Sequence, residues 1–410
     1  MKETIAALKD CLANESSHPF ATPGANKRSF DQGAERKSFL GRAMITVHEK
    51  LALLLVPLVM GVAPLDLRAE TASAPAGFYR LDCLGNSDTI ISIPFSRPET
   101  TFAHVQSIAG NVVTVSGTPG WSVNQFVYAF GSQSNTYYLR VLAGAKEGSY
   151  YPIVANGTNS LTLSLGGDDL SAVTNGTRLL VAPYWTLGSA FPGGRGVIPS
   201  ASTLLQKTKI LIPNFSGAGI NLTPAATYYY LGSANCWCRV NDAQGTYGTS
   251  NMNDVVLIPD LYFILRHPVT TNTVFTARGS VPMSKLATPI VTQPASKQDN
   301  FVALTRPATN TLNESGLVQS GAFLSSASQL NQNGDQLLVF NNGQTGQNKS
   351  PAATYYYLGS LSRWCRVNDS QGTYGTTDMG NEPVFVPGTG VIIRKKLGST
   401  STNWVNSPNY

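Results

Sequence analysis

The chain has 410 residues, of which 42% are hydrophobic and only 13% charged, with a formal net charge of +6. The hydrophobic share is sufficient for folded cores and excludes a largely disordered polymer. The positive charge is spread along the chain, so we do not expect the clustered basic face of a nucleic-acid-binding protein. Thirty-eight glycines and 24 prolines predict many short strands and tight turns.

The first predicted element is an export signal at residues 44–74. Its apolar core covers about residues 51–65, is too short to span a bilayer comfortably and is preceded by Lys50. The small residues at 72–74 follow it, as at a signal-peptide cleavage site. We therefore expect a secreted, cell-surface or periplasmic bacterial protein without a stable transmembrane span after signal removal.

The residues before this signal form an unusual extension. Because Met44 stands just ahead of the apolar core, we interpret residues 1–43 as a mis-assigned start of the chain. A cytoplasmic extension on an uncleaved anchor is the alternative.

Two parts of the chain carry nearly the same sequence. Residues 224–233, which include a Tyr-Tyr-Tyr triplet, recur as 351–360, and the Trp-Cys-Arg-Val-Asn-Asp segment at 237–242 recurs at 364–369. Matching apolar runs flank both copies, and a Gln-Gly motif follows each at a turn-like position. Each copy therefore predicts about four strands.

A weaker sequence similarity extends this repeat upstream, since residues 88–98 resemble residues 299–307. About 85 residues with several short apolar runs, separated by Gly, Asn and Pro, interrupt only the first copy. The sequence predicts an all-β fold with two tandem repeated β modules, each a sandwich or barrel, and a small β-barrel-like domain inserted in the first. The expected bounds are 75–99 and 185–296 for the first module, 100–184 for the inserted domain, and 297–410 for the second module.

Several segments have a distinctive amino-acid sequence. The chain resembles an uncharacterised family of exported β-rich proteins from Verrucomicrobia in segments 77–80, 87–98, 117–121, 143–148, 183–188, 299–304, 352–357 and 388–394. The resemblance covers nearly all of residues 77–396. It implies export and a β-rich fold, and it carries no established activity or catalytic residue.

Recognised catalytic and metal-binding patterns are missing from the sequence. Downstream of the signal the histidines are His104 and His267, and neither has an acid or nucleophile at a recognised spacing. We therefore expect no enzyme, no catalytic residues, no metal and no cofactor. A calcium loop at Asn241-Asp242 and at Asn368-Asp369 is a weaker alternative to a plain turn.

Four cysteines follow the signal, namely Cys83, Cys236, Cys238 and Cys365. An even number in an oxidising compartment permits two disulfides. Free buried thiols are the alternative, and the sequence leaves the pairing open.

Six aromatic residues of the repeat are the candidate binding residues: Tyr228, Tyr230, Trp237, Tyr355, Tyr357 and Trp364. Because side chains alternate faces along a strand, at most two tyrosines of each triplet share a side. Such rings either complete the core of a β-sheet or form a surface on which sugar rings stack.

The sequence favours a secreted or cell-surface structural or interaction protein. The alternative is an extracellular carbohydrate-binding or adhesive module that uses the repeated Tyr and Trp surfaces, and an enzyme comes third. Expected partners are an extracellular polysaccharide or other envelope proteins, and not nucleic acid.

Overall fold

The computed structural model of the chain describes residues 75–241, 246–329, 334–368 and 373–410. The predicted signal, the extension before it and the Asp residues at 242 and 369 lie outside these ranges. The structure is mostly β, with 39% strand and 4% helix, as the glycine- and proline-punctuated sequence predicts. No helix in the described part of the chain is long and apolar enough to cross a membrane.

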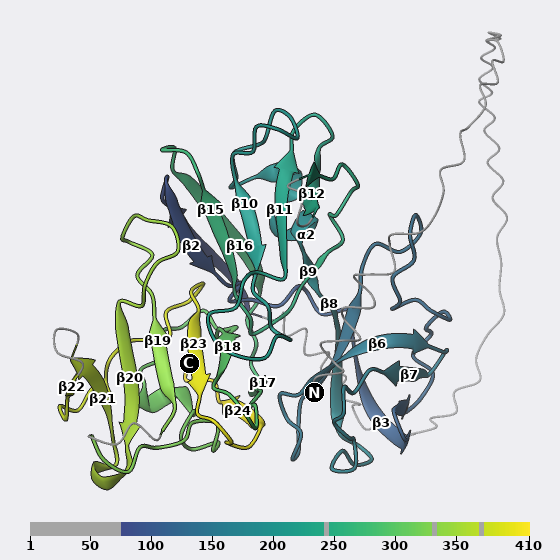
Figure 1. Cartoon of the computed structure of the whole chain (residues 1–410). Helices are drawn as coiled ribbons and strands as arrows, with labels where there is room; N and C mark the ends of the chain where they lie inside the picture. Colours follow the sequence, from purple (N-terminus) through teal and green to yellow (C-terminus); the bar gives the residue numbers. More distant parts are fainter. Residues whose placement is uncertain (1–74, 242–245, 330–333, 369–372) are drawn as a thin grey trace, which may run out of the picture. The chain divides into compact units, whose positions relative to one another are not determined.

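The first six-stranded sheet is antiparallel throughout and gathers strands from distant parts of the chain (Figure 1). Its order is β13-β12-β11-β10-β15-β2. The strands are β2 (Ser87–Ile91), β10 (Lys209–Ile212), β11 (Ala226–Leu231), β12 (Cys236–Asn241), β13 (Thr246–Tyr247) and β15 (Phe263–His267).

The second six-stranded sheet has the order β18-β23-β19-β20-β21-β22. Tyr228 lies opposite Arg239 in the first sheet, and Tyr355 lies opposite Arg366 in the second. The strands are β18 (Gln298–Val302), β19 (Gln336–Val339), β20 (Ala353–Leu358), β21 (Arg363–Asn368), β22 (Thr373–Tyr374) and β23 (Val391–Lys395).

A strand pair accompanies each of these sheets. β1 (Ala76–Cys83) pairs with β16 (Thr273–Ser280), and β17 (Leu286–Ile290) pairs with β24 (Thr402–Asn406). β1 and β2 are neighbours in sequence, as are β17 and β18, so each strand pair is joined to its sheet by short connections.

The insertion forms a closed six-stranded barrel in the order β3-β4-β7-β6-β5-β8. Closure leaves no exposed sheet edge. Its strands are β3 (Thr101–Ala109), β4 (Val112–Val115), β5 (Tyr137–Val141), β6 (Tyr150–Asn156), β7 (Ser160–Leu163) and β8 (Arg178–Pro183). The predicted small barrel in this part of the chain is confirmed.

Within the described residues, helix is confined to single turns that follow the barrel or join strands. After β8, the two-residue strand β9 (Trp185–Thr186) pairs with β14 (Val256–Leu257). The short helix α2 (Leu187–Ala190) begins there because the Thr186 hydroxyl accepts a hydrogen bond from the Ser189 amide. The part of the chain that the structure describes also contains three 3₁₀ turns: η1 (Pro192–Gly194), η2 (Asn313–Ser315) and η3 (Gly359–Leu361).

Each of the three β units has its own hydrophobic core. Trp237 and Phe191 lie in the core of the first sheet, Phe126 and Leu139 in the barrel, and Trp364 in the core of the second sheet. Burial of these large rings removes 150–250 Å² of surface each, roughly, and so stabilises each unit by several kcal/mol.

Each sheet has one ion pair between two of its own strands, and an asparagine from the other sheet is hydrogen-bonded to that pair. The Arg266 guanidinium donates to the Asp88 carboxylate over 2.7 Å, and the backbone amide of Asn348 donates to the same carboxylate over 2.7 Å. In the second sheet, Arg394 donates to Asp299 over 2.7 Å, and the Asn221 amide donates to Asp299 over 2.9 Å. Each Asn therefore reaches from the loop before one sheet's Tyr-rich strand to an ion pair of the other sheet.

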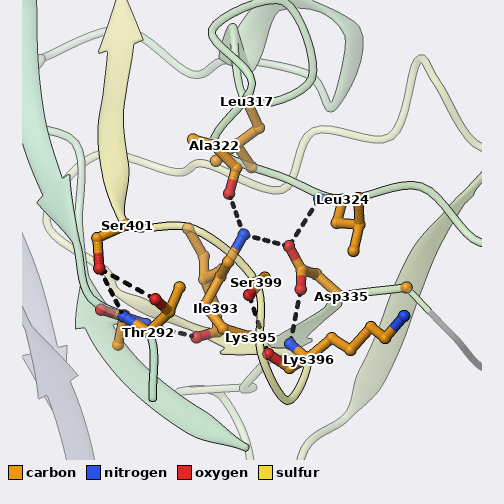
Figure 2. A network of polar contacts seen from close by, with 12 residues as sticks. Thr292, Leu317, Ala322, Leu324, Asp335, Ile393, Lys395, Lys396, Ser399 and Ser401 are labelled. Atoms are coloured by element: carbon orange, nitrogen blue, oxygen red, sulfur yellow. Dashed lines mark hydrogen bonds and ion pairs between the residues drawn. The ribbon is translucent and has the colours of Figure 1, made fainter. Parts of the chain in front are cut away.

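A buried ion pair lies at the end of β23 (Figure 2). The Lys395 ammonium donates to the Asp335 carboxylate and, over 2.8 Å, to the Ala322 carbonyl. Asp335 also accepts from the backbone amides of Leu324 and Lys396. Both charges are thus paired and hydrogen-bonded, which is the condition for burying them at acceptable cost.

Candidate functional site

The six aromatic residues predicted from the sequence lie mainly inside the protein. Tyr228, Tyr230 and Trp237 belong to the core of the first sheet. Tyr355 and Trp364 belong to the core of the second, with the half-buried Tyr357 packed against it. The expected alternation holds, since Tyr229 and Tyr356, the middle residues of the triplets, lie in separate clusters on the other face. These rings complete cores and do not form an exposed stacking surface.

One of the six, Tyr228, also lines a cavity of about 410 Å³. This volume is within the range of small-molecule sites. The cavity lies where barrel strand β5 meets the first sheet and the segment from Val255 to Phe263. Its walls are mainly apolar or aromatic, formed by side chains that include Phe95, Trp185, Ile212, Phe215, Tyr228, Leu257, Tyr262 and Phe263.

The alternation of β5 brings a charge into this cavity. Tyr137, Leu139 and Val141 point into the barrel core, so Tyr138 and Arg140 point outward. Arg140 nevertheless has only 1% of its surface exposed, because the cavity-lining segments cover this side of the strand. A strand that is buried on both faces thus places a guanidinium at an internal wall.

The Arg140 guanidinium is poorly compensated. Its Nε and Nη2 groups have no hydrogen-bond partner in the described part of the chain. The rings of Tyr138 and Tyr150 lie 5.5 and 6.0 Å from its central carbon, close enough for cation–π attraction. That attraction is much weaker than the solvation lost on burial, which costs several kcal/mol for an unpaired ion.

The phenols around Arg140 are neutral. Burial raises the pKa of Tyr138 and raises that of Tyr150 well above its ordinary value. The Tyr150 hydroxyl donates to the Pro259 carbonyl over 3.1 Å. These side chains therefore supply rings and hydroxyl groups and no negative charge to balance Arg140.

Asp260 is the second charged residue buried at the cavity wall, with 2% of its surface exposed. It has a left-handed backbone conformation, with φ of 60°, which is uncommon outside glycine, asparagine and aspartate. Its Oδ1 atom accepts from the Thr305 hydroxyl, and its amide donates to the same Thr305 oxygen over 3.0 Å. Its Oδ2 atom has no hydrogen-bond partner among the described residues.

These unsatisfied atoms are unusual because buried polar groups in proteins nearly always have partners. Arg140 contributes two unsatisfied donors and Asp260 one unsatisfied acceptor, all at one cavity. The arrangement can accept a molecule that offers an acceptor to the guanidinium and a donor to the carboxylate.

A second cavity of about 210 Å³ lies between the barrel and the second sheet. Its carboxylate, Asp168, accepts from the Tyr151 hydroxyl over 2.8 Å and is paired with Lys146. Since the charge here is already satisfied, this smaller cavity has less capacity to recognise a polar ligand.

Cysteine and histidine are used structurally. Cys83, Cys236, Cys238 and Cys365 are free and buried, so the structure corresponds to the free-thiol alternative and has no disulfide between them. No group of three or more His, Cys, Asp or Glu residues placed to hold a metal occurs in the described ranges.

His267 is fully buried in the first sheet. Its ring is hydrogen-bonded to the hydroxyl groups of Thr208 and Thr273, both over 2.8 Å. Burial lowers its pKa to about 4, so the ring is neutral at neutral pH.

No family model, curated protein or solved structure matches this chain.

Sequence reasoning missed Arg140 and Asp260. A signal for Arg140 is present in the segment Tyr137–Val141, where one arginine interrupts an otherwise apolar strand. A charged residue in such a strand is either exposed on one face or buried for a reason, and the sequence does not distinguish the two. Asp260 follows a proline in a turn-like context, and its position at the cavity depends on the tertiary fold.

Proposed function

We propose that this protein is a non-catalytic interaction protein of the bacterial cell exterior that binds a small organic molecule in the 410 Å³ cavity. The observation that carries the proposal is the buried guanidinium of Arg140, whose Nε and Nη2 groups lack partners at the wall of that cavity. A bound ligand with an acceptor group would restore the hydrogen bonds that Arg140 loses on folding.

The location outside the cytoplasm is part of the same proposal. It is supported by the apolar run at 51–65 with its basic flank and small-residue end. A structural role among envelope proteins or extracellular polysaccharides fits this location, and a bound small molecule would add recognition to it.

We further propose that the two six-stranded sheets belong to two copies of one module, the first interrupted by the barrel. Support comes from the identical segments 224–233 and 351–360 and from the corresponding strand order of the two sheets. The cross-strand pairing of Tyr228 with Arg239 also corresponds to that of Tyr355 with Arg366. The pairing of β17 with β24 favours a second module that begins near residue 286, earlier than the 297 expected from sequence.

A carbohydrate-binding function is the second candidate. It is favoured by the rings of Trp185 and Tyr228, which line the cavity close to the carboxylate of Asp260. Aromatic rings beside hydrogen-bonding groups suit the alternating apolar and hydroxyl faces of a sugar. In this version the ligand enters a cavity, and of the six repeated aromatic residues Tyr228 is the one that lines it.

The test is a binding screen with the full chain. A library of small organic acids, alcohols and monosaccharides, together with a glycan array, is screened by thermal shift and isothermal titration calorimetry. We expect at least one ligand whose binding is lost in Arg140→Met and kept in Arg278→Met, a matched change at an exposed arginine that does not line the cavity. Binding that survives Arg140→Met unchanged would exclude this cavity as the site.

A further inference from the structure

The charge around the cavity sets the charge of its ligand. Besides Arg140 and Asp260, the fully buried Arg306 interacts electrostatically with both of them. The partners of Arg306 are neutral oxygens, from Asn406, Pro282, Ser284 and Tyr410. Arg140, Arg306 and Asp260 give the buried groups of this region a formal charge of +1, and the exposed Arg239 in the cavity lining adds a further positive charge. A ligand with a single negative charge would neutralise the buried groups.

The geometry of Arg140 favours a carboxylate as that negative group. Neighbouring N–H groups of a guanidinium match the two oxygens of a carboxylate or a phosphate. A phosphate monoester carries a charge of about −1.5 to −2 at pH 7. In a mainly apolar cavity beside the carboxylate of Asp260, that second charge would add desolvation cost and repulsion.

Asp260 defines the second polar group of the ligand. Its free Oδ2 atom is an acceptor, so it needs a hydrogen-bond donor. An ammonium group would satisfy it, but a zwitterion leaves the region at +1. A hydroxyl group satisfies Oδ2 and adds no charge, so that a hydroxyl and a carboxylate together bring the buried charge to zero.

We propose that the ligand of this cavity is a small hydroxycarboxylate with a ring or other largely apolar body, an inference that rests on the proposed binding function. Its carboxylate pairs with the guanidinium of Arg140, its hydroxyl donates to the carboxylate of Asp260, and its body contacts the aromatic walls near Trp185 and Tyr228. Aromatic acids and sugar acids share this chemistry.

The experiment compares charged probes with matched neutral ones on the full chain. Calorimetry measures 4-hydroxyphenylacetate against 4-hydroxyphenylacetamide, and glucuronate against glucose. We expect one of the two acids to bind at least tenfold more tightly than its neutral partner. The acid that does so distinguishes an aromatic source from a sugar source. Equal binding of acid and neutral partner would overturn the inference and leave the proposed binding function standing, whereas no binding of any probe would count against both.

Variants assign the effect to the residues. Arg140→Met is expected to weaken the preferred acid at least tenfold and to leave its neutral partner unchanged, whereas Arg278→Met, at an exposed arginine outside the cavity lining, keeps the preference. Asp260→Asn is expected to weaken the preferred acid several-fold and to have less effect on phenylacetate, which lacks the hydroxyl. An acid preference that persists in Arg140→Met would contradict the assignment. If that variant fails to fold, the comparison of acid and neutral probes on the wild-type protein still tests the inference.

Discussion

The two six-stranded sheets correspond in strand order but differ in a buried polar contact beside β15 and β23. At the end of β15, the neutral ring of His267 is hydrogen-bonded to the Thr208 hydroxyl. At the end of β23, Lys395 is paired with Asp335 (Figure 2). Thr208 accepts from the Ile198 amide, much as Asp335 accepts from the Leu324 amide. One backbone arrangement therefore accommodates either a neutral or an ionic contact, provided that each donor meets an acceptor and each charge meets its opposite.

The largest effect on stability is expected from breaking the ionic contact between Lys395 and Asp335. Lys395→Met leaves the Asp335 carboxylate buried with backbone amides as its remaining partners. We expect the free energy of unfolding to fall by about 3–5 kcal/mol, the usual consequence of removing one member of a buried pair. Urea denaturation of the variant and wild type measures this difference.

The first sheet supplies the control for that experiment. The double variant Asp335→Thr with Lys395→His places the Thr–His contact of the first sheet in the second. It should recover more than half of the stability lost in Lys395→Met, because no unpaired charge remains. A double variant as unstable as the single one would show that the two positions are not equivalent.

Acid is expected to destabilise the protein through the neutral contact of His267. Burial holds the pKa of His267 at about 4, below the value of about 6.5 in an unfolded chain. As pH falls from about 6.5 to 4, the unfolded chain takes up a proton that the folded protein refuses, so stability declines by up to roughly 3 kcal/mol.

This pH effect is measured as the difference between wild type and His267→Gln in urea denaturation from pH 7 to pH 4. The wild type should lose more stability over this range, because glutamine does not titrate. Parallel curves for the two proteins would contradict a neutral buried histidine.

A smaller effect is expected at the ion pair within each sheet that an asparagine of the other sheet contacts. Asp88→Asn removes the carboxylate beside Arg266, and Asp299→Asn does the same beside Arg394. Each change should cost about 2 kcal/mol, typical of hydrogen bonds to charged groups. Chemical denaturation should give the two variants similar losses, and a difference above about 2 kcal/mol would break the correspondence between the sheets.

The sequence predicted local features well. Short strands follow from the Gly, Pro and β-branched pattern, and the six-stranded barrel lies within the predicted insertion. The alternation in the tyrosine triplet predicted that Tyr229 faces away from Tyr228 and Tyr230, and it does. These outcomes depend on strand geometry alone, which a sequence pattern encodes directly.

The candidate site depends on contacts that a sequence does not encode locally. Arg140, Asp260 and Thr305 meet at one cavity although more than 160 residues separate the first from the last. The sequence left open whether the rings of Trp237 and Trp364 complete a core or form a stacking surface, and in the structure both belong to cores. Tertiary packing also placed an unpredicted charge at a cavity.

The most direct test of the account is a crystal structure of the protein with the preferred hydroxycarboxylate. The account predicts density in the 410 Å³ cavity, with carboxylate oxygens within hydrogen-bond distance of the Arg140 guanidinium and a hydroxyl group at the Asp260 carboxylate. A ligand bound elsewhere, with this cavity holding only solvent, would contradict it.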